Sequence, residues 1–365
     1  MRIGIDAHFL SKISQGTGTY SYQLIKSLID HVSDEKLVIL NKDNVLDKWG
    51  KPQCLEWGKL WSNYTPFNVL FGYDYLARKE HLDVIHTNYL SSIFPTKSAK
   101  IITVHDILFK SHPQFFPQKL RKGIEAFTIA CFKNVDVIIA VSNFTKEQLL
   151  YYYPFVKDKV RVVYEAASDN FYSLGNMYEK VLPTAFGIMK PYILFVGRFA
   201  PMKNIEPLIT YYLRNSEIQN EYDLVLVGKF DKSFPNQHLK QQIYSTPKIR
   251  VLTGVDNQHL NILYNYASLL YFVSNGEGFG LPILEAMSAG CPVLTSNTTA
   301  CDEIAGNAAF KVSPSSYDEI SDALNTILKS PTLRERLSAN GFKHASEFSW
   351  SKCAQQTLDI YHACL

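Results

Sequence analysis

The sequence predicts an α/β protein with two doubly wound parallel sheets, and three observations support this. Short apolar, β-branched runs recur along the chain with helical stretches between them, as expected for parallel strands buried on both faces. About six such runs precede residue 190 and about six follow it, more than one sheet comfortably holds. The chain has 365 residues, a length at which single hydrophobic cores have usually stopped growing. We therefore expect two domains of one architecture.

The apolar runs give the expected strands in chain order. In the first domain they are Ile3–Ala7, Leu37–Leu40, Val84–His86, Ile101–Val104, Val135–Val141 and Val160–Val163. In the second they are Tyr192–Val196, Leu224–Val227, Ile249–Leu252, Leu269–Val273, Val293–Thr295 and Ala309–Val312. Residues 173–191 contain two prolines and two glycines with little periodicity, so they are the expected linker between domains 1–172 and 192–346.

Composition excludes several classes of function. Hydrophobic residues make up 46% and charged residues 19% of the chain, as in ordinary globular proteins. No apolar stretch reaches 18 residues, and the first residues suit a strand better than a signal peptide, so we expect a cytoplasmic protein. Six scattered cysteines show no zinc or redox spacing. The net charge of +3 is too small to indicate nucleic acid as a partner.

The most informative segment runs from Ser274 to Glu285. Glu277 and Glu285 lie on either side of a glycine-rich turn that follows a buried strand and opens a helix. Pro282 suits the first turn of that helix, which we expect over Ile283–Ala289 before Gly290. Backbone amides at a helix start attract a phosphate. Because a phosphate needs no carboxylates, the two glutamates are expected to hold hydroxyl groups of a sugar and a ribose.

A second group of residues follows the strand Tyr192–Val196. Gly197 ends the strand, and Arg198 and Lys203 lie on the loop and helix start that come next. Ligands of open α/β sheets bind at the carboxyl ends of the strands. A guanidinium and an ammonium placed there can neutralise a diphosphate leaving group. A solvated loop that happens to carry charges is the alternative.

These two segments resemble the family-4 retaining glycosyltransferases of the GT-B fold, and the resemblance extends over nearly all of the chain. It implies two Rossmann-like domains that face each other across a cleft, with a last helix (here 347–365) that returns to the first domain. It implies that Glu277 contacts the donor sugar, Glu285 the nucleotide ribose, and Arg198 with Lys203 the diphosphate. Pro201 and Asn204 also match the family pattern. The resemblance further assigns donor binding to Gly197, Val255, Gly278, Phe279, Gly280 and Leu281.

Two segments of the first domain are also candidates. Gly16 and Gly18 precede an expected helix at Ser21–Leu28, and the resemblance makes them part of a loop near the donor phosphate. The alternative is that both glycines only form a turn. The third glycine of the dinucleotide fingerprint is missing, which disfavours an NAD enzyme. His105 ends the strand Ile101–Val104, and the resemblance brings its backbone or ring to a sugar hydroxyl. A structural His–Asp pair is the alternative.

The resemblance implies transfer of a hexose, with retention, from a nucleotide sugar to a glycan or lipid-linked acceptor. The opening Gly4–Ala7 and the Ser296-Asn297 segment look like polysaccharide mannosyltransferases, which favours GDP-mannose over a UDP-hexose. Cys301 and His8 depart from residues frequent in those enzymes, so the donor sugar stays open. A non-hydrolysing nucleotide-sugar epimerase and a catalytically silent nucleotide-binding protein are the other classes.

Cofactors and membrane contact complete the expectations. The sequence contains no Asp-X-Asp pair, so no metal site and no cofactor other than the nucleotide-sugar substrate is expected. The basic and aromatic stretch Phe115–Lys122 suits either a membrane surface, with its lipid-linked acceptor, or an ordinary solvated face. Work at the inner face of the cytoplasmic membrane is therefore a further expectation.

Overall fold

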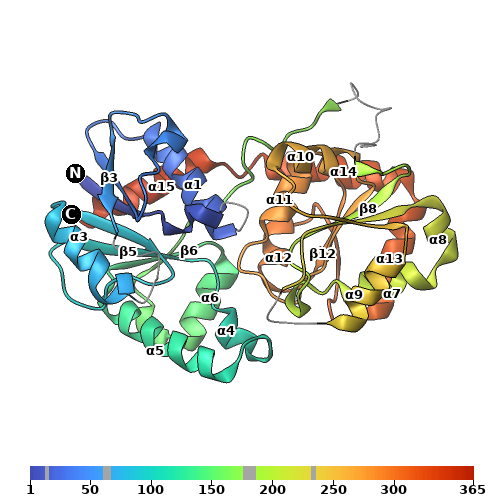
Figure 1. Ribbon diagram of the computed structural model, residues 1–365, viewed down its shortest axis with the longest axis horizontal. Coiled ribbons are helices and arrows are strands. Elements are labelled where there is room, and N and C mark those ends of the chain that lie inside the picture. The colour runs from blue at the N-terminus through green and yellow to red at the C-terminus, as the bar shows by residue number, and fades with distance from the viewer. Residues whose placement is uncertain (13–15, 61–66, 176–185, 232–235) are drawn as a thin grey trace. The chain divides into compact units, whose positions relative to one another are not determined.

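The computed structural model describes residues 1–12, 16–60, 67–175, 186–231 and 236–365. The chain divides into two compact units (Figure 1). The first consists of Met1–Glu165 together with Ser349–Leu365, and the second of Ala166–Phe348. Of the expected linker 173–191, residues 176–185 lie outside the described part of the chain. Within the described residues, no helix has the length and apolar character that crossing a bilayer requires.

The first unit is built on a seven-stranded sheet whose described pairings are all parallel, in the order β3-β2-β1-β4-β5-β6-β7. Its strands are β1 (Arg2–Asp6), β2 (Lys36–Asn41), β3 (Leu55–Lys59), β4 (Val84–Asn88), β5 (Ala99–Val104), β6 (Val137–Ala140) and β7 (Val160–Val162). The chain moves outward in one direction from β1 to β3 and in the other from β4 to β7. The sheet therefore has a topological switch point between β1 and β4.

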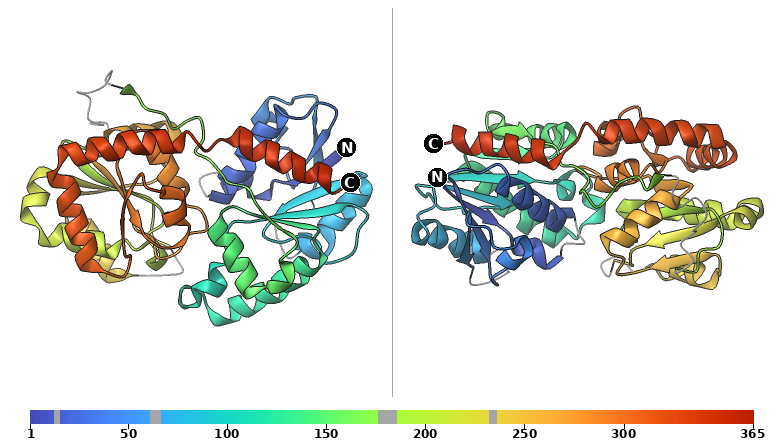
Figure 2. Two further views of the ribbon diagram at one scale, coloured as in Figure 1. Left: turned by 180° about the vertical axis from the view of Figure 1, so that it is seen from behind. Right: turned by 90° about the horizontal axis from the view of Figure 1, so that it is seen from above.

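Helices cover both faces of this sheet. They are α1 (Gly16–Ile29), α3 (Tyr73–Lys79), α4 (Leu108–Ser111), α5 (Gln118–Asn134), α6 (Asn143–Tyr152) and α15 (Trp350–Ala363), with short turns η1 (His8–Lys12), η2 (Leu46–Trp49), η3 (Asn68–Gly72), η4 (Pro113–Phe115) and η5 (Pro154–Val156). The C-terminal helix α15 packs along α1 (Figure 2), and its residues at helical spacing, Trp350, Ala354, Leu358 and Tyr361, are buried. The last helix thus belongs to the first unit, as the resemblance implied.

Strand β3 was not expected from the sequence. Its residues Leu55–Lys59 read Leu-Glu-Trp-Gly-Lys, which is neither an apolar run nor β-branched. The strand lies at the edge of the sheet and pairs with β2 alone, in a register that sets Leu37 opposite Leu55. An edge strand has one neighbour and needs less burial than a central strand, so its sequence carries a weak signal.

The second unit repeats the architecture with a six-stranded sheet, in the order β10-β9-β8-β11-β12-β13, whose described pairings are again all parallel. Its strands are β8 (Tyr192–Val196), β9 (Asp223–Val227), β10 (Ile249–Leu252), β11 (Leu269–Phe272), β12 (Val293–Ser296) and β13 (Phe310–Val312). Here β8 and β11 flank the switch point. The fold is thus a pair of doubly wound parallel sheets, as the alternation of strands and helices predicted.

The helices of the second unit form a layer on each side of its sheet. They are α7 (Glu206–Arg214), α8 (Ser216–Glu221), α9 (Gln237–Ser245), α10 (Asn257–Tyr266), α11 (Leu281–Ser288), α12 (Thr299–Ala305), α13 (Tyr317–Lys329) and α14 (Pro331–Ala345), with the short turn η8 (Pro201–Lys203). In Figure 1, α7, α9 and α13 lie on one side of the sheet, and α10, α11 and α12 lie on the other.

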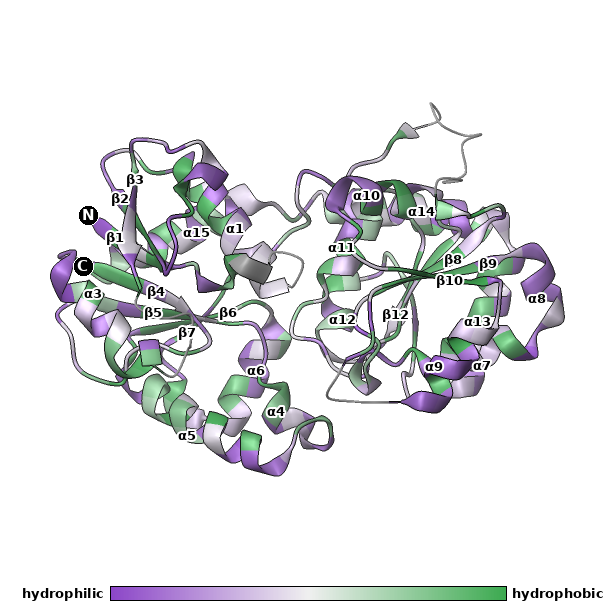
Figure 3. Cartoon of the chain, in the orientation of Figure 1, coloured by the Kyte–Doolittle hydropathy of each residue, from purple (hydrophilic) through white to green (hydrophobic). Residues whose placement is uncertain are grey.

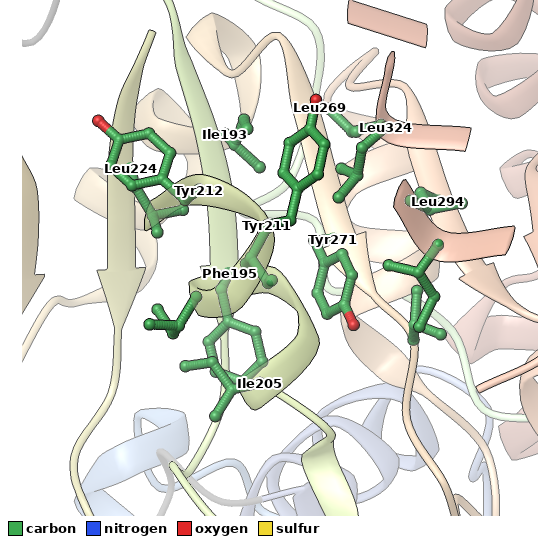
Figure 4. Packing of buried hydrophobic residues seen from close by; sticks show 14 of the residues in the cluster. Ile193, Phe195, Ile205, Tyr211, Tyr212, Leu224, Leu269, Tyr271, Leu294 and Leu324 are labelled. Atoms are coloured by element: carbon green, nitrogen blue, oxygen red, sulfur yellow. The ribbon is translucent and has the colours of Figure 1, made fainter. Parts of the chain in front are cut away.

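The core of the second unit explains why its strands read as unbroken apolar runs. Alternate strand residues such as Ile193, Phe195 and Tyr271 pack against α7 and α13 (Figure 4). The residues between them, such as Leu194 and Phe272, are also buried. Figure 3 shows β8 as hydrophobic, whereas α8 is largely hydrophilic. A sheet covered on both faces cannot alternate apolar with polar residues.

Candidate active site

The two charged segments singled out in the sequence follow the two strands at the switch point of the second sheet. Gly197, Arg198 and Lys203 follow β8, whereas Glu277 and the glycine-rich turn follow β11, and β8 and β11 are hydrogen-bonded neighbours. In a parallel sheet the carboxyl ends of all strands lie at one edge, where ligands of such folds bind. The topology therefore brings the two segments together.

Two glycines allow the ends of β8 and β9 to approach each other closely. Gly197 and Gly228 both have a φ of 149°, in the region that favours glycine. A Cβ on Gly228 would lie 1.9 Å from the carbonyl oxygen of Gly197. The Gly197 amide donates to the carbonyl of Val227 at 2.9 Å. A side chain at Gly228 would therefore push the start of the Arg198 loop out of place.

The turn that carries Lys203 is held by the segment after β11. The backbone amide of Asn275 donates to the carbonyl of Met202 at 2.8 Å, and its side-chain amide donates to the carbonyl of Pro201 at 3.1 Å. The hydroxyl of Tyr271 donates to the carbonyl of Asn204 at 3.0 Å, and Asn204 has a left-handed φ of 51°. These contacts fix the position from which the Lys203 side chain extends.

Lys203 and Glu277 form a direct, partly buried ion pair. The Lys203 ammonium donates to Oε1 of Glu277, and the two side chains are 19% and 13% exposed. The ammonium also lies 5.3 Å from the centroid of the Phe272 ring. Because the pair is largely shielded from water, the attraction between the two charges is strong and holds both side chains in place. The residue expected to bind phosphate and the residue expected to bind the sugar are thus in direct contact.

Arg198 is held by an acidic residue that the sequence did not single out. Its Nη1 lies 3.0 Å from Oδ2 of Asp231, which follows Gly228 on the loop after β9. Arg198 is 57% exposed, whereas Asp231 is 13% exposed. A guanidinium has several donors, so one contact with Asp231 leaves others for an anion. A glycine at the end of a buried strand followed by an acid is the signal that could have identified Asp231.

Helix α11 begins at the end of the glycine-rich turn. Gly280 occupies the N-cap position with a left-handed φ of 103°, and no described side chain caps the helix. Pro282 lies in its first turn, as expected. Phe279 is buried, and its ring centroid lies 6.5 Å from that of Phe348. The start of α11 carries the positive end of the helix dipole at the same edge of the sheet as Lys203.

Glu285 lies within α11 and has an unusual environment. Its Oε2 accepts a hydrogen bond of 2.9 Å from the hydroxyl of Tyr264 on α10. Burial raises the pKa of Glu285 to about 7, although this hydrogen bond opposes the shift. Val255 precedes the same helix α10, after Gly254 with its φ of 70°. Helix α10 therefore links the position expected for the base with the position expected for the ribose.

The remaining candidates lie in the first unit. His105 follows β5, and its ring makes a contact on each side. Nδ1 lies 2.9 Å from Oε1 of Glu165, and Nε2 lies 3.0 Å from Oδ1 of Asn88. Both ring nitrogens are thus engaged by protein groups. The sequence suggested Asp106 as a structural partner, but Asp106 accepts from the Tyr89 hydroxyl instead.

The expected loop at Gly16 and Gly18 is wrong in its local structure. Both residues lie in the first turn of α1, which begins at Gly16 rather than at Ser21. Neither glycine has a positive φ. Gln15, the first residue of that motif, lies outside the described residues. The two glycines do not form a turn here. The helix includes them because its later residues, such as Leu24 and Leu28, are buried and stabilise it.

The two departures from the family pattern both lie in buried surroundings. His8 follows β1, and its Nδ1 lies 2.7 Å from Oδ1 of the fully buried Asp6. Cys301 is buried on α12, where burial raises the pKa of its thiol to about 12. Its neighbour Asp302 is paired with Lys311 at 2.6 Å. The Cys301 thiol is therefore a packing group in its protonated form.

A cavity of about 340 Å³ lies beside the loop that carries Lys203. Among the described residues, Phe199, Ile205, Leu239 and Tyr317 contribute to its lining, whereas Arg198, Lys203, Glu277 and Glu285 do not. The candidate site is therefore defined by the switch point and its charged side chains rather than by this cavity.

Comparisons with known proteins identify the family of the chain. The family model described as Glycosyltransferase Family 4 matches residues 15–169, and the one described as Glycosyl transferases group 1 matches residues 183–344. The chain is 30% identical over 268 residues to the O-antigen chain mannosyltransferase B of Escherichia coli, covering 72% of this chain and 69% of that protein. It is 27% identical over 239 residues to the O-antigen chain mannosyltransferase RfbU of Salmonella typhimurium, covering 65% and 63%.

Solved structures show the same fold. The structure of Anabaena Alr3699/HepE in complex with UDP and glucose superposes with a TM-score of 0.76 at 17% identity, covering 100% of both chains. That similarity concerns the fold, whereas the family models and the Escherichia coli relative concern the sequence. Together they show that this chain belongs to the family-4 glycosyltransferases, is a hexosyltransferase, and has the GT-B fold.

Proposed function

We propose that this glycosyltransferase moves mannose from GDP-mannose, with retention, to a hydroxyl of a glycan or lipid-linked acceptor. The observation that carries the proposal is the Lys203–Glu277 ion pair beside the start of α11. A nucleotide sugar combines an anion with two sets of hydroxyls. The switch point of the second sheet offers cations, helix amides and two carboxylates to match.

Each side chain has a role in this proposal. Lys203, Arg198 and the amides around Gly278–Leu281 neutralise the diphosphate as it leaves, which makes departure of the nucleotide independent of a metal. Glu277 accepts from a hydroxyl of the donor sugar, and Lys203 keeps its carboxylate in place. Glu285 accepts from the ribose hydroxyls. Asp231 positions Arg198 through its contact of 3.0 Å.

Retention follows from an attack on the face that the leaving group vacates. The acceptor hydroxyl approaches the anomeric carbon on the side of the departing diphosphate, and a phosphate oxygen of the donor takes its proton. This route requires strong stabilisation of the leaving group and no protein nucleophile. It is consistent with a site built from cations, helix amides and paired carboxylates.

The choice of mannose rests on the relatives. Both sequence relatives described above are named O-antigen chain mannosyltransferases. A UDP-hexose is the second candidate, because the Anabaena structure of the same fold holds UDP and glucose. The base would be read by backbone and apolar contacts near Val255, so the choice between GDP and UDP rests on the relatives as well.

A thermal-shift panel tests the donor. GDP and GDP-mannose are expected to raise the melting temperature more than UDP and UDP-glucose at equal concentration. At a concentration of about 100 times Kd, the bound nucleotide stabilises the fold by about 2.7 kcal/mol. A larger shift with the UDP compounds would replace GDP-mannose as the donor. NMR of the product should show the anomeric configuration of the donor, and the opposite configuration would contradict retention.

The alternative classes are separated by leaving out the acceptor. An epimerase of the same fold would convert the donor sugar to its isomer when incubated with donor alone, whereas a transferase needs an acceptor. A silent binding protein would bind the nucleotide and convert neither substrate. The presence of Glu277, which we assign to the donor sugar, argues against a protein that binds the nucleotide alone.

We also propose that the first unit contacts an anionic membrane surface through the start of α5. Lys119, Leu120 and Lys122 are exposed there, and Leu120 is 52% exposed. A lipid-linked acceptor at the inner face of the cytoplasmic membrane would be presented at such a surface. An apolar side chain between lysines can enter the headgroup region while the ammonium groups contact anionic lipids.

Vesicle binding tests the membrane contact. Lys119→Gln/Lys122→Gln is expected to weaken binding to vesicles with anionic lipid by roughly 10- to 30-fold, because each lysine contributes about 1 kcal/mol near such a surface. Lys48→Gln/Lys157→Gln removes two exposed lysines elsewhere in the unit and is the matched control. Equal losses in both variants, or no binding by the unaltered protein, would remove the proposal.

A further inference from the structure

In the first unit, a buried hydrogen-bond network surrounds His105. Glu165 is 2% exposed and Asn88 is 4% exposed, and they engage the two nitrogens of the His105 ring. Glu165 is the last residue of the first segment of the first unit, three residues beyond β7. A buried carboxylate is costly unless a cation or several donors face it. The described residue that forms an ion pair with Glu165 is His105.

The hydrogen bonds of Ser21 and Asn88 in this network have defined directions. The Ser21 hydroxyl donates to the carbonyl of Thr17 one turn earlier in α1, at 3.1 Å. Its oxygen therefore accepts from the side-chain amide nitrogen of Asn88, at 3.1 Å. This fixes the orientation of the Asn88 amide and leaves its carbonyl oxygen facing Nε2 of His105. Nε2 must consequently carry a hydrogen.

The other nitrogen also faces an acceptor. Nδ1 lies 2.9 Å from a carboxylate oxygen of Glu165, and an ionised carboxylate only accepts. A ring with an acceptor at each nitrogen satisfies both contacts when it carries both protons. From this geometry we infer that Glu165 is a positioning residue that keeps His105 as the imidazolium, so that the ring donates on both sides and cannot accept a proton from the acceptor substrate.

The groups that surround the pair leave this charge in place. Tyr20 of α1 lies edge-on to the His105 ring, with centroids 4.7 Å apart, and Tyr89 lies 5.3 Å away. Burial raises the pKa of both phenols well above the usual value, so both are neutral. Cys353 of α15 faces Glu165, and burial raises the pKa of its thiol as well.

Two further groups complete the surroundings of the pair. Burial lowers the pKa of His86 on β4 to about 3, so this neighbouring ring is neutral at physiological pH. Asp106 lies next to His105 in the chain and accepts from the Tyr89 hydroxyl at 3.0 Å. Of the described groups named here, Glu165 and Asp106 are the charged ones, and both carboxylates favour a positive ring.

The backbone around the network is also unusual. Tyr89, directly after β4, adopts a left-handed φ of 61°, a conformation that is uncommon for an aromatic residue. Its amide donates to the carbonyl of Thr103 at 2.8 Å, and this contact ties the end of β4 to the end of β5. Strained backbone of this kind persists where surrounding contacts fix it, commonly at functional sites. The network thus joins α1, β4, β5 and the segment after β7 around one cationic ring.

This inference rests on the proposed function only in its second test. The first test uses the unaltered protein with ¹⁵N-labelled histidine, in which ring nitrogen shifts report protonation. The signals of His105, identified by their loss in His105→Gln, are expected to show two protonated nitrogens at pH 8. A neutral ring at pH 8, whether or not Glu165 then carries the proton, would overturn the inference, and it would do so without any assay of transfer.

The second test compares the transfer rate of Glu165→Gln with that of the unaltered protein over a pH range. The amide of this variant keeps the shape and a hydrogen-bond acceptor but carries no charge, so the ring loses its second proton at a lower pH. The ratio of rates is expected to be near 1 at pH 6 and to fall roughly 10-fold by pH 8, the change expected when one charged hydrogen bond is lost.

The control for this ratio removes a different carboxylate of the same unit. Glu56 pairs with Arg2 at 2.8 Å on partly exposed side chains, and Glu56→Gln is expected to give a ratio that does not vary with pH. A pH-independent ratio for Glu165→Gln would show that the carboxylate has only a structural role. If no sugar transfer is found at all, the proposed function fails, and the ¹⁵N measurement still decides the protonation of His105.

Discussion

Replacing Lys203 with alanine is expected to lower the rate of sugar transfer by roughly 10²- to 10³-fold, the loss typical of removing one group that stabilises developing charge. Lys203 is partly buried and its ammonium is held in place by Glu277. Little reorganisation of the protein is therefore needed when negative charge develops next to it. Arg198→Ala is expected to lose roughly 10²-fold for the same reason. Arg198 is more exposed, and solvent screens its charge more strongly. Single-turnover measurement of product formation at saturating donor reports the rate of the sugar-transfer step.

An exposed ion pair of the same unit provides the matched control. Lys329 lies 3.1 Å from Glu217, and both side chains are more than half exposed. Lys329→Ala removes an ammonium from a lysine–glutamate pair without touching the switch point, and it is expected to leave the transfer rate within about twofold. Near-normal transfer by Lys203→Ala would mean that the ammonium has no part in the departure of the diphosphate.

Glu277→Gln separates the structural from the chemical role of the same pair. If Lys203 served only to neutralise Glu277, removing both charges together would restore activity. We expect the double variant Lys203→Ala/Glu277→Gln to be at least as slow as Lys203→Ala, because in the proposed function each group also contacts the donor. A rate in the double variant well above that of Lys203→Ala would contradict this assignment. Circular dichroism of each variant checks that the unit remains folded.

Glu285→Gln is expected to stabilise the protein at pH 8 while it weakens nucleotide binding. Burial raises the pKa of the Glu285 carboxyl from an ordinary value of 4.5 to about 7. The folded chain therefore binds a proton between these two pH values that the unfolded chain does not hold. Stability contributed by this proton is fully present below about pH 4.5 and is lost as the pH rises from there through about 7. The ionised carboxylate then costs the folded state on the order of 1 to 3 kcal/mol at pH 8.

Thermal unfolding at two pH values measures this effect. The melting temperature of Glu285→Gln should exceed that of the unaltered protein at pH 8, and the two should approach each other at pH 5. Affinity for the nucleoside diphosphate is expected to fall roughly 10-fold, because an amide offers one acceptor where the carboxylate offers two. An unchanged affinity would show that Glu285 does not bind the ribose.

Tyr264→Phe is the matched variant for this pair. It keeps the Glu285 carboxylate but removes the hydroxyl that donates to it at 2.9 Å. The carboxylate then lacks the contact that opposes the effect of burial, so Tyr264→Phe should be less stable than the unaltered protein at pH 8. Stability changes of opposite sign in the two variants would show that the carboxylate is retained for binding at a cost to folding.

Much of the fold was predictable because buried parallel strands leave a strong signal. Runs such as Leu224–Val227 have no polar interruption, since helices cover both faces of the sheet. Strand β3 gave no such signal, because an edge strand can carry Glu56 and Lys59 on surfaces that reach water. The start of α1 was misplaced for a related reason. Gly16 and Gly18 are poor helix formers taken alone, and packing of the rest of α1 overrides them.

The sequence alone was enough to single out the charged segments that meet at the candidate site. Residue types that bind phosphates and hydroxyls follow β8 and β11 in the chain, and a doubly wound topology requires the ends of these strands to be neighbours. Local motifs of this kind can be found because the interacting groups are close in sequence or are attached to recognisable strands.

Only the tertiary structure decided which charges meet. Asp231 reaches Arg198 across 33 residues and Glu165 reaches His105 across 60, from segments with no motif of their own. The partner of Nε2 of His105 depends on the orientation of Asn88, which in turn depends on a serine in α1. Electrostatic interactions act through space and depend on burial, and neither distance nor burial is encoded at any single position of the chain.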